Sequence, residues 1–389
     1  MSFDTKIDRR GTHCSKWDTM ETLYGVSPDD GLAMWVADMD FRPPQCVQDA
    51  VQRMGDHGGY GYFGDESKYR AAIQWWMKER HGWAIDLDWI FSLHGLVNGT
   101  AMCVDTYTKP GDGVILFTPV YHAFARVIKA ADRQVVEMEL ANKNGRYEMD
   151  FDAYDKAMTG NEKMVILCSP HNPGGRVWTP PELQQVADFC KRHDLILVSD
   201  EIHHDLTYGA KHTAMSLVDP SITDRLITMT AATKTFNIAG SHIGNVIIED
   251  PDLRSRFAKR MAGLGLSPNS FGLFMVTAAY TPEGAKWVDE LMGYLIENQR
   301  IFNDGINAIP GLKAMPLEAT YLSWVDFSGT GMPRAEFTSR VQDQAKIAVN
   351  HGPTFGTGGA DFLRFNIAAP RVIIEDAVAR MKSAFSDLQ

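Results

Sequence analysis

The chain has 389 residues, of which 44% are hydrophobic and 22% are charged, and its formal net charge is -11. This length allows two domains with a large buried core, and the composition excludes the disordered and fibrous classes of protein. The acidic balance argues against a protein that chiefly binds the phosphate backbone of nucleic acid or an anionic membrane surface.

The beginning of the chain and its cysteines indicate a cellular compartment. The first ten residues, MSFDTKIDRR, are polar and charged and do not resemble a signal peptide. Five cysteines without a C-x-x-C pair argue against a disulfide framework or a thiolate metal site. The longest uncharged stretch, 261–282, is interrupted by Ser267-Pro268-Asn269-Ser270, so we do not expect it to span a membrane. We therefore expect a cytoplasmic protein.

The predicted elements divide the chain into three parts. Residues 1–45 are irregular and are expected to join a small domain. Residues 46–285 are expected to form a large domain, because short apolar runs alternate there with helical patterns. Five runs are predicted as buried strands, at residues 113–117, 164–168, 195–198, 226–230 and 245–248. Their spacing favours a mostly parallel sheet covered by helices on both faces.

One helix of the large domain has a clear beginning. Thr179 and Glu182 form a capping box around two prolines. Apolar residues then follow at helical spacing, at positions 183, 186, 187 and 190.

The last part of the chain, residues 286–389, is predicted to be a smaller α+β domain. A long helical region, roughly 270–307, leads into it from the large domain. It continues with a strand at 321–327, a helix near 334–346 and a final strand near 362–367.

Chemically useful side chains follow four of the predicted strands. They are an aromatic ring, an amide, a carboxylate and an amine, namely Tyr121, Asn172, Asp200 and Lys234. Because the carboxyl ends of parallel strands meet at one edge of a sheet, we expect these groups to converge. Together they suit pyridoxal 5'-phosphate (PLP): the amine forms an imine, and the acid pairs with the pyridinium nitrogen.

A phosphate site is predicted just before the first of these strands. The sequence Gly95-Leu96-Val97-Asn98-Gly99-Thr100 opens a helical pattern. Backbone N–H groups at the N-terminus of a helix attract a phosphate group.

These residues resemble a fold type I PLP enzyme of the class I/II aminotransferase superfamily. Within it, WVADMDF at 35–41 and SDEIH at 199–203 resemble the carbon–sulfur β-lyase branch, the cystathionine β-lyases of the MalY/PatB type. KTFNI at 234–238 and ATYLSW at 319–324 indicate the same branch. The resemblance spans about 30–385 and implies an aspartate-aminotransferase-like fold, with a large, mostly parallel domain and a smaller α+β domain. It also implies a homodimer with the active site at the subunit interface.

The resemblance implies a role for each candidate residue. Lys234 is the Schiff-base lysine and the base that removes the Cα proton. Asp200 pairs with the pyridinium nitrogen, Tyr121 stacks on the ring, and Asn172 reaches the ring oxygen. Arg364 clamps the carboxylate of an amino-acid substrate through its bidentate fork.

Further residues are implied around the phosphate and the pocket. The phosphate is held by Gly95, Leu96, Val97 and Thr233. Tyr62 reaches the phosphate of the neighbouring subunit, with Tyr60 as the alternative. His203 belongs to the cofactor pocket, although many aminotransferases have a tyrosine at its position.

The chain departs from the family pattern around the phosphate. Ala231 stands where a serine is usual, and His242 replaces an arginine that many aminotransferases have eight residues after the lysine. We therefore expect phosphate binding to depend more on backbone amides, on Thr233 and on the partner chain.

Two other sequence patterns could suggest a binding site, but we do not interpret them as functional. Gly59, Gly61 and Gly64 spell G-x-G-x-x-G, but no predicted strand precedes them, as a dinucleotide site requires. His203, His204 and Asp205 suggest metal ligands, but adjacent side chains point apart, so no metal site is predicted.

The predicted function is β-elimination on a sulfur-containing amino acid, such as cystathionine or a cysteine conjugate, giving thiol, pyruvate and ammonia. The alternatives are a PLP-dependent aminotransferase and a PLP-bound regulatory protein. No nucleic-acid or membrane partner is expected.

Overall fold

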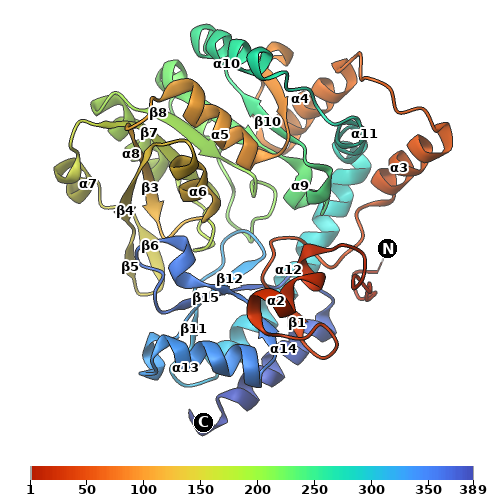
Figure 1. Ribbon diagram of the computed structural model, residues 1–389, viewed down its shortest axis with the longest axis vertical. Coiled ribbons are helices and arrows are strands. Elements are labelled where there is room, and N and C mark those ends of the chain that lie inside the picture. Colours follow the sequence, from red (N-terminus) through yellow and green to blue (C-terminus); the bar gives the residue numbers. More distant parts are fainter. Residues whose placement is uncertain (1, 389) are drawn as a thin grey trace.

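The computed structural model describes residues 2–388; Met1 and Gln389, the outermost residues of the two predicted end segments, lie outside this range. A seven-stranded sheet forms the centre of the molecule (Figure 1), in the order β2-β10-β9-β8-β7-β3-β4. The strands are β2 (Ile90–Leu93), β3 (Gly113–Thr118), β4 (Gln134–Glu139), β7 (Glu162–Cys168), β8 (Ile196–Asp200), β9 (Leu226–Thr230) and β10 (Gly244–Ile247).

Five neighbouring strands of this sheet, from β4 to β9, run parallel. In their register, Cys168 lies opposite Asp200, and Asp200 lies opposite Met229. The carboxyl ends of β7, β8 and β9 therefore meet at one edge, as the sequence predicts.

The strand expected at 245–248 does not join the parallel set. β10 runs antiparallel to both β9 and β2. A parallel return needs a crossover, usually a helix, that carries the chain back along the sheet. Here the helix between β9 and β10 is α9 (Ala232–Thr235), which has only four residues.

Helices cover both faces of the sheet. On one face, α5 (Leu96–Tyr107), α6 (Ala123–Ala130) and α10 (Pro251–Leu264) pack on inward residues such as Val114 and Leu116. On the other face, α7 (Phe151–Ala157) and α8 (Pro180–Arg192) pack on the alternate residues Ile115 and Phe117. This alternation is the period-two pattern of a doubly covered strand.

The structure confirms the predicted beginning of one helix and divides another predicted helical region into two helices. The capping box of α8 is present, with Thr179 and Glu182 in the predicted roles. The region expected to be helical over 270–307 is two helices, α11 (Ser270–Ala279) and α12 (Pro282–Asn307). The Thr281 side chain accepts a hydrogen bond from Gly284 N, so it caps a second helix that begins at proline.

A smaller antiparallel sheet follows α12 in the chain, in the order β11-β12-β15-β14. Its strands are β11 (Lys313–Ala314), β12 (Leu322–Asp326), β14 (Asn350–His351) and β15 (Phe362–Asn366). The helices α12, α13 (Arg334–Ser339) and α14 (Arg371–Ala384) accompany it.

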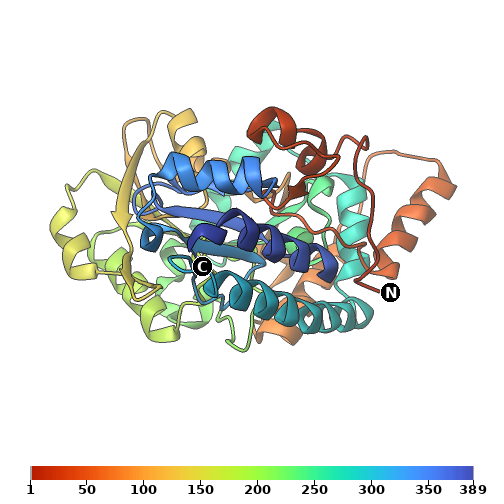
Figure 2. The same cartoon turned by 90° about the horizontal axis from the view of Figure 1, so that it is seen from below.

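The N-terminal segment lies beside this smaller sheet (Figure 2). It contains α1 (Ser15–Asp18), α2 (Met20–Tyr24) and β1 (Leu32–Ala33). β1 pairs in parallel with β13 (Ile347–Ala348) near the other end of the chain. The division into domains at residues 45 and 285 stays a prediction.

Two helices follow the N-terminal segment, α3 (Gln45–His57) and α4 (Ser67–His81). Residues 58–66 between them have no helix or strand. Within the part of the chain that the structure describes, none of the helices has the length and apolar character needed to cross a membrane.

Candidate active site

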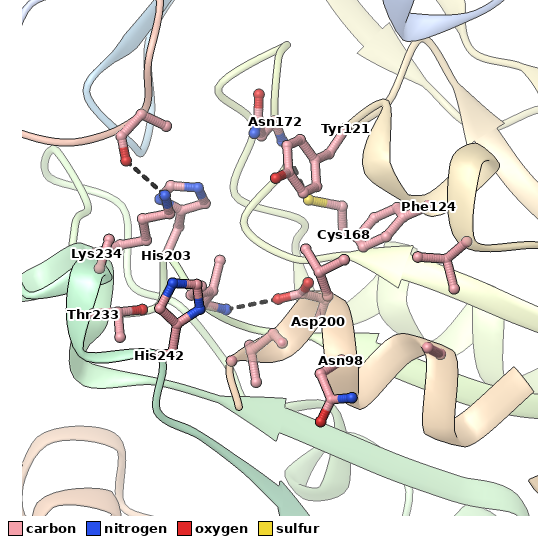
Figure 3. A pocket seen from close by; sticks show the side chains of 18 of the residues that line it. Asn98, Tyr121, Phe124, Cys168, Asn172, Asp200, His203, Thr233, Lys234 and His242 are labelled. Carbon is pink, nitrogen blue, oxygen red and sulfur yellow. Dashed lines mark hydrogen bonds between the residues drawn. The ribbon is translucent and has the colours of Figure 1, made fainter. Parts of the chain in front are cut away.

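A cavity of about 540 Å³ lies at the carboxyl edge of the parallel strands (Figure 3). The first turn of α5 and the ends of β3, β7, β8 and β9 contribute its walls. The predicted convergence is therefore confirmed. The cavity brings together nine of the predicted residues: Gly95, Leu96, Val97, Tyr121, Asn172, Asp200, His203, Thr233 and Lys234.

Lys234 extends from α9 into this cavity. Its Nζ donates a hydrogen bond to the carbonyl oxygen of Ala37 at 2.6 Å. Burial lowers the pKa of Lys234 to about 8, and the charge of Arg364 also lowers it, whereas Asp38 and Asp200 oppose the shift. A lysine with such a pKa offers a substantial fraction of neutral amine near neutrality, which a nucleophile or a base requires.

Asp200 is the last residue of β8 and is buried. Its Oδ1 accepts a hydrogen bond from Ile202 N at 3.1 Å. Burial raises the pKa of Asp200 to about 7, and the neighbouring Glu201 also raises it. A buried carboxylate is stabilised by a cationic donor, and the protonated ring nitrogen of PLP is a donor of this kind.

Arg364, on β15, lies next to the cavity rather than on its wall. Its Nη1 donates to Asn172 Oδ1 at 3.0 Å, and its Nη2 donates to Trp35 O at 2.9 Å. Its Nε is buried and has no hydrogen-bond partner within residues 2–388. A buried donor without a partner is rare in proteins, and a substrate carboxylate would satisfy it.

The beginning of α5 fits a phosphate group. Gly95 precedes the helix with φ 86°, a conformation that favours glycine. The N–H groups of the first turn have no partner inside a helix and are free to bind an anion. Gly244 lies directly behind this turn, where an added Cβ would be 2.7 Å from Leu96 Cδ2. The close approach fixes the turn against β10.

His203 lies close to Lys234 in the cavity (Figure 3). Its Nδ1 is buried and finds no hydrogen-bond partner among the described residues. Burial, together with the charge of Lys234, holds the pKa of His203 well below its usual value. The imidazole is therefore neutral at physiological pH.

Several residues of the cavity wall were not predicted as site residues. Cys168 had a signal, because it ends one of the apolar strand runs, and His242 was noted only as a departure from the family pattern. The helix α6 supplies three others without any sequence signal. The additional lining residues are Ala37, His94, Asn98, Ala101, Phe124, Arg126, Val127, Cys168, Ile202, Ala239 and His242.

Tyr62 does not line the cavity of its own chain. It lies in the irregular segment 58–66 and is fully exposed. Tyr60 is also exposed, and its ring lies 5.7 Å from the ring of Phe271. The choice between the two tyrosines as the residue that serves a neighbouring subunit stays a prediction.

A buried cluster behind the cavity holds α9 in place. The carboxylate of Asp205 accepts hydrogen bonds from Trp76 Nε1 at 3.1 Å and Thr235 Oγ1 at 2.8 Å, and it lies 2.9 Å from His81 Nε2. His81, His204 and Asp205 have ligand atoms within 4.8 Å of one another. His81 lies 124 residues before Asp205, so no local sequence pattern connects it with this group. We interpret the group as an anchor that joins α4 to the helix carrying Lys234.

The fold and the cavity match a known family. The chain belongs to the class I and II aminotransferase family, whose model matches residues 31–380. Its fold is that of the PLP-dependent aminotransferases, and its cofactor is PLP, as predicted. The buried Asp200, the unpaired Arg364 Nε and the first turn of α5 fit this cofactor and an amino-acid substrate.

Similar proteins cover the whole length of the chain. It is 37% identical over 390 residues to the cystathionine beta-lyase PatB of Bacillus subtilis (strain 168), with 99% of this chain and 100% of PatB covered. Cystalysin from Treponema denticola, which contains PLP, has a TM-score of 0.94 at 39% identity and covers 100% of this chain and 99% of its own. The PLP-bound C-S lyase from Staphylococcus hominis has a TM-score of 0.90 at 30% identity, covering 99% and 98%.

Proposed function

We propose that this chain is a PLP-dependent carbon–sulfur lyase. It would carry out β-elimination on cystathionine or a cysteine conjugate and release thiol, pyruvate and ammonia. The observation that carries the proposal is the half-buried Lys234 in one cavity with the buried carboxyl of Asp200. The names of the relatives, a cystathionine beta-lyase and a C-S lyase, support the choice of elimination.

Each of three residues in or beside the cavity would have a separate role in the proposed reaction. When bound, PLP supplies an electron sink for the electrons released at Cα. Lys234 would hold the cofactor covalently, and its amine, when free, would accept the Cα proton. Asp200 keeps a proton on the ring nitrogen. Arg364 fixes the substrate carboxylate through its free donors, so that the Cα–H bond is presented to Lys234.

The remaining predicted residues position the cofactor. Tyr121 would stack on the ring, and Asn172, whose Oδ1 accepts from Arg364, would donate from its amide nitrogen to the ring oxygen. The first turn of α5 and Thr233 would hold the phosphate, and the neutral His203 lies near Lys234 in the same cavity.

An aminotransferase is the second candidate function. The family model supports it, because the same cavity residues would serve both reactions up to the removal of the Cα proton. A PLP-bound regulatory protein is a weaker alternative, since binding alone requires no base at Cα.

Product analysis with L-cystathionine separates the two reactions. We expect pyruvate, ammonia and one equivalent of thiol without any added 2-oxo acid, because a thiolate leaves readily from Cβ once the Cα proton is removed. L-Alanine, which has no leaving group at Cβ, is the matched control and should release no pyruvate. Amino-group transfer that requires a 2-oxo acid, with no thiol released, would assign the chain to the aminotransferases.

A homodimer is part of the proposal. Segment 58–66 carries the exposed Tyr60 and Tyr62, and Phe63 contacts the exposed Phe274 of α11 at 5.7 Å between ring centroids. Exposed aromatic residues that gather in this way are typical of protein interfaces. In a dimer, Tyr62 would extend to the phosphate of the partner's cofactor.

Subunit mixing tests the role of Tyr62. Chains with Tyr62→Phe and chains with Lys234→Ala should form hybrid dimers in which one site has both native residues. We expect these mixtures to show more activity than either parent, because both defects fall in the same site of the hybrid and its other site is intact. Tyr60→Phe mixed in the same way is the control. Mixtures with no gain over the parents would remove the cross-subunit assignment.

A further inference from the structure

The segment 35–41, which contains the WVADMDF motif, passes between two functional side chains. Its backbone is neither helix nor strand. Trp35 O accepts from Arg364 Nη2 at 2.9 Å, whereas Ala37 O accepts from Lys234 Nζ at 2.6 Å and from the Tyr321 hydroxyl at 3.0 Å. One short stretch of backbone therefore sets the positions of both the arginine and the lysine.

Amide side chains hold the intervening backbone. Asn366 Nδ2 donates to the carbonyl oxygens of Val36 and Asp38. Asn237, three residues after the lysine, donates to Met39 O at 2.9 Å and accepts from Met39 N at 2.9 Å. The segment thus obtains from side chains the hydrogen bonds that a strand would obtain from a neighbouring strand.

Two cations from the N-terminal segment complete this arrangement. Arg9 contacts Asp38 at 2.7 Å and Asp40 at 2.8 Å, and it also donates to Met39 O at 2.9 Å. Lys16 Nζ lies 2.8 Å from Asp40 and 3.6 Å from Asp38. Although burial opposes the shift, Arg9 and Lys16 hold the pKa of Asp38 below its usual value. The two cations and two carboxylates balance in charge.

Arg9 fastens the N-terminal segment to the cavity wall. Its guanidinium bonds three successive residues, 38, 39 and 40, directly after Ala37. The neighbouring Arg10 has a different environment, because it pairs with Asp8 and Asp29 at the surface.

We propose that Arg9 is a positioning residue. Together with Lys16 it fixes Asp38 and Asp40, and this keeps the carbonyl oxygen of Ala37 in place to accept the hydrogen bond from the Lys234 amine. The inference rests on the proposed role of Lys234 in binding PLP, but not on the identity of the substrate. Arg9 does not line the cavity. It acts through the backbone of residues 37–40.

The arrangement has an electrostatic consequence at Lys234. The charged groups that act on this amine are Asp38, Asp200 and Arg364. Asp38 raises the pKa of Lys234 because a nearby negative charge favours the ammonium form, and hydrogen bonding to Ala37 O favours the same form. Loss of the Asp38 charge therefore lowers the proton affinity of the lysine nitrogen.

The test uses the holoenzyme and reads the protonation of the nitrogen that joins Lys234 to PLP, from a pH titration of the visible absorbance. In Asp38→Asn, which keeps the shape but not the charge, the midpoint should fall by about half a unit to one unit. In Arg9→Gln, kcat should fall roughly tenfold or more, with a smaller change in KM, because a misplaced lysine slows proton transfer. Arg10→Gln is the matched control and should leave the titration midpoint and kcat unchanged.

Arg9→Lys provides a second variant if Arg9→Gln does not fold. It keeps the charge but loses the fork, and should recover only part of kcat. An Arg9 variant that behaves like Arg10→Gln, or an unchanged midpoint in Asp38→Asn, would overturn the inference. If the protein were an aminotransferase, Asp38→Asn would still shift the titration midpoint in the same way. An error in the proposed lyase reaction can therefore be distinguished from a failure of this inference.

Discussion

Replacing Lys234 by alanine should abolish turnover. The change removes the covalent attachment of the cofactor and the base at Cα together, and general acid–base catalysis alone contributes about 10²–10⁴-fold. We therefore expect kcat for pyruvate release from L-cystathionine to fall by at least roughly 10²–10⁴-fold.

Chemical trapping gives an independent measurement of the same residue. Borohydride reduction of the unmodified holoenzyme should fix the cofactor irreversibly, and peptide mapping should find it on Lys234. The Lys234→Ala protein should bind PLP only reversibly and should yield no labelled peptide. A label on another lysine, or a variant that retains activity, would exclude Lys234 as the cofactor residue.

The next largest effect is expected from Arg364→Lys. A charge-assisted hydrogen bond contributes about 1.5–3 kcal/mol, so kcat/KM should fall roughly tenfold to hundredfold. Lysine keeps the charge but loses the planar fork, whose separate nitrogens bind Asn172 and Trp35 O and leave Nε for a substrate carboxylate. The visible spectrum of the bound cofactor should be preserved, because lysine keeps the positive charge that Arg364 places near Lys234.

A suitable control for this variant is Arg133→Lys. Arg133 is also a buried arginine, but it bonds Thr108 and Ala131, which follow the ends of α5 and α6, and none of the three lines the cavity. Its replacement carries a similar packing cost without touching the site. If Arg364→Lys and Arg133→Lys have the same kinetics, another residue must bind the substrate carboxylate.

The sequence was sufficient to predict the edge of the sheet that carries the chemistry. Tyr121, Asn172, Asp200 and Lys234 each follow a short apolar run, and local patterns of this kind do not depend on distant contacts. The parallel register then brings Cys168, Asp200 and Met229 side by side.

Local sequence patterns could not predict the direction of β10 or which side chains from distant parts of the chain contact each other. The reversal at β10 follows from the shortness of α9, which has no clear sequence signal. The contacts of Arg9 with Asp38 and of His81 with Asp205 join residues 29 and 124 positions apart. Charged residues of this kind resemble ordinary surface positions until the tertiary fold brings them together.

The position of Arg364 on the smaller sheet gives the substrate a mechanical role. Lys234 follows β9 of the large sheet, whereas Arg364 belongs to β15 of the small one. In the proposed function, an amino acid bound through its amine at one end and by its carboxylate at the other would be a tether across the boundary between the two sheets. Because the amine and the carboxylate of every α-amino acid share one Cα, the span of this tether would be the same for all of them, so the boundary between the two sheets would select α-amino acids as a class and not by the length of their side chains.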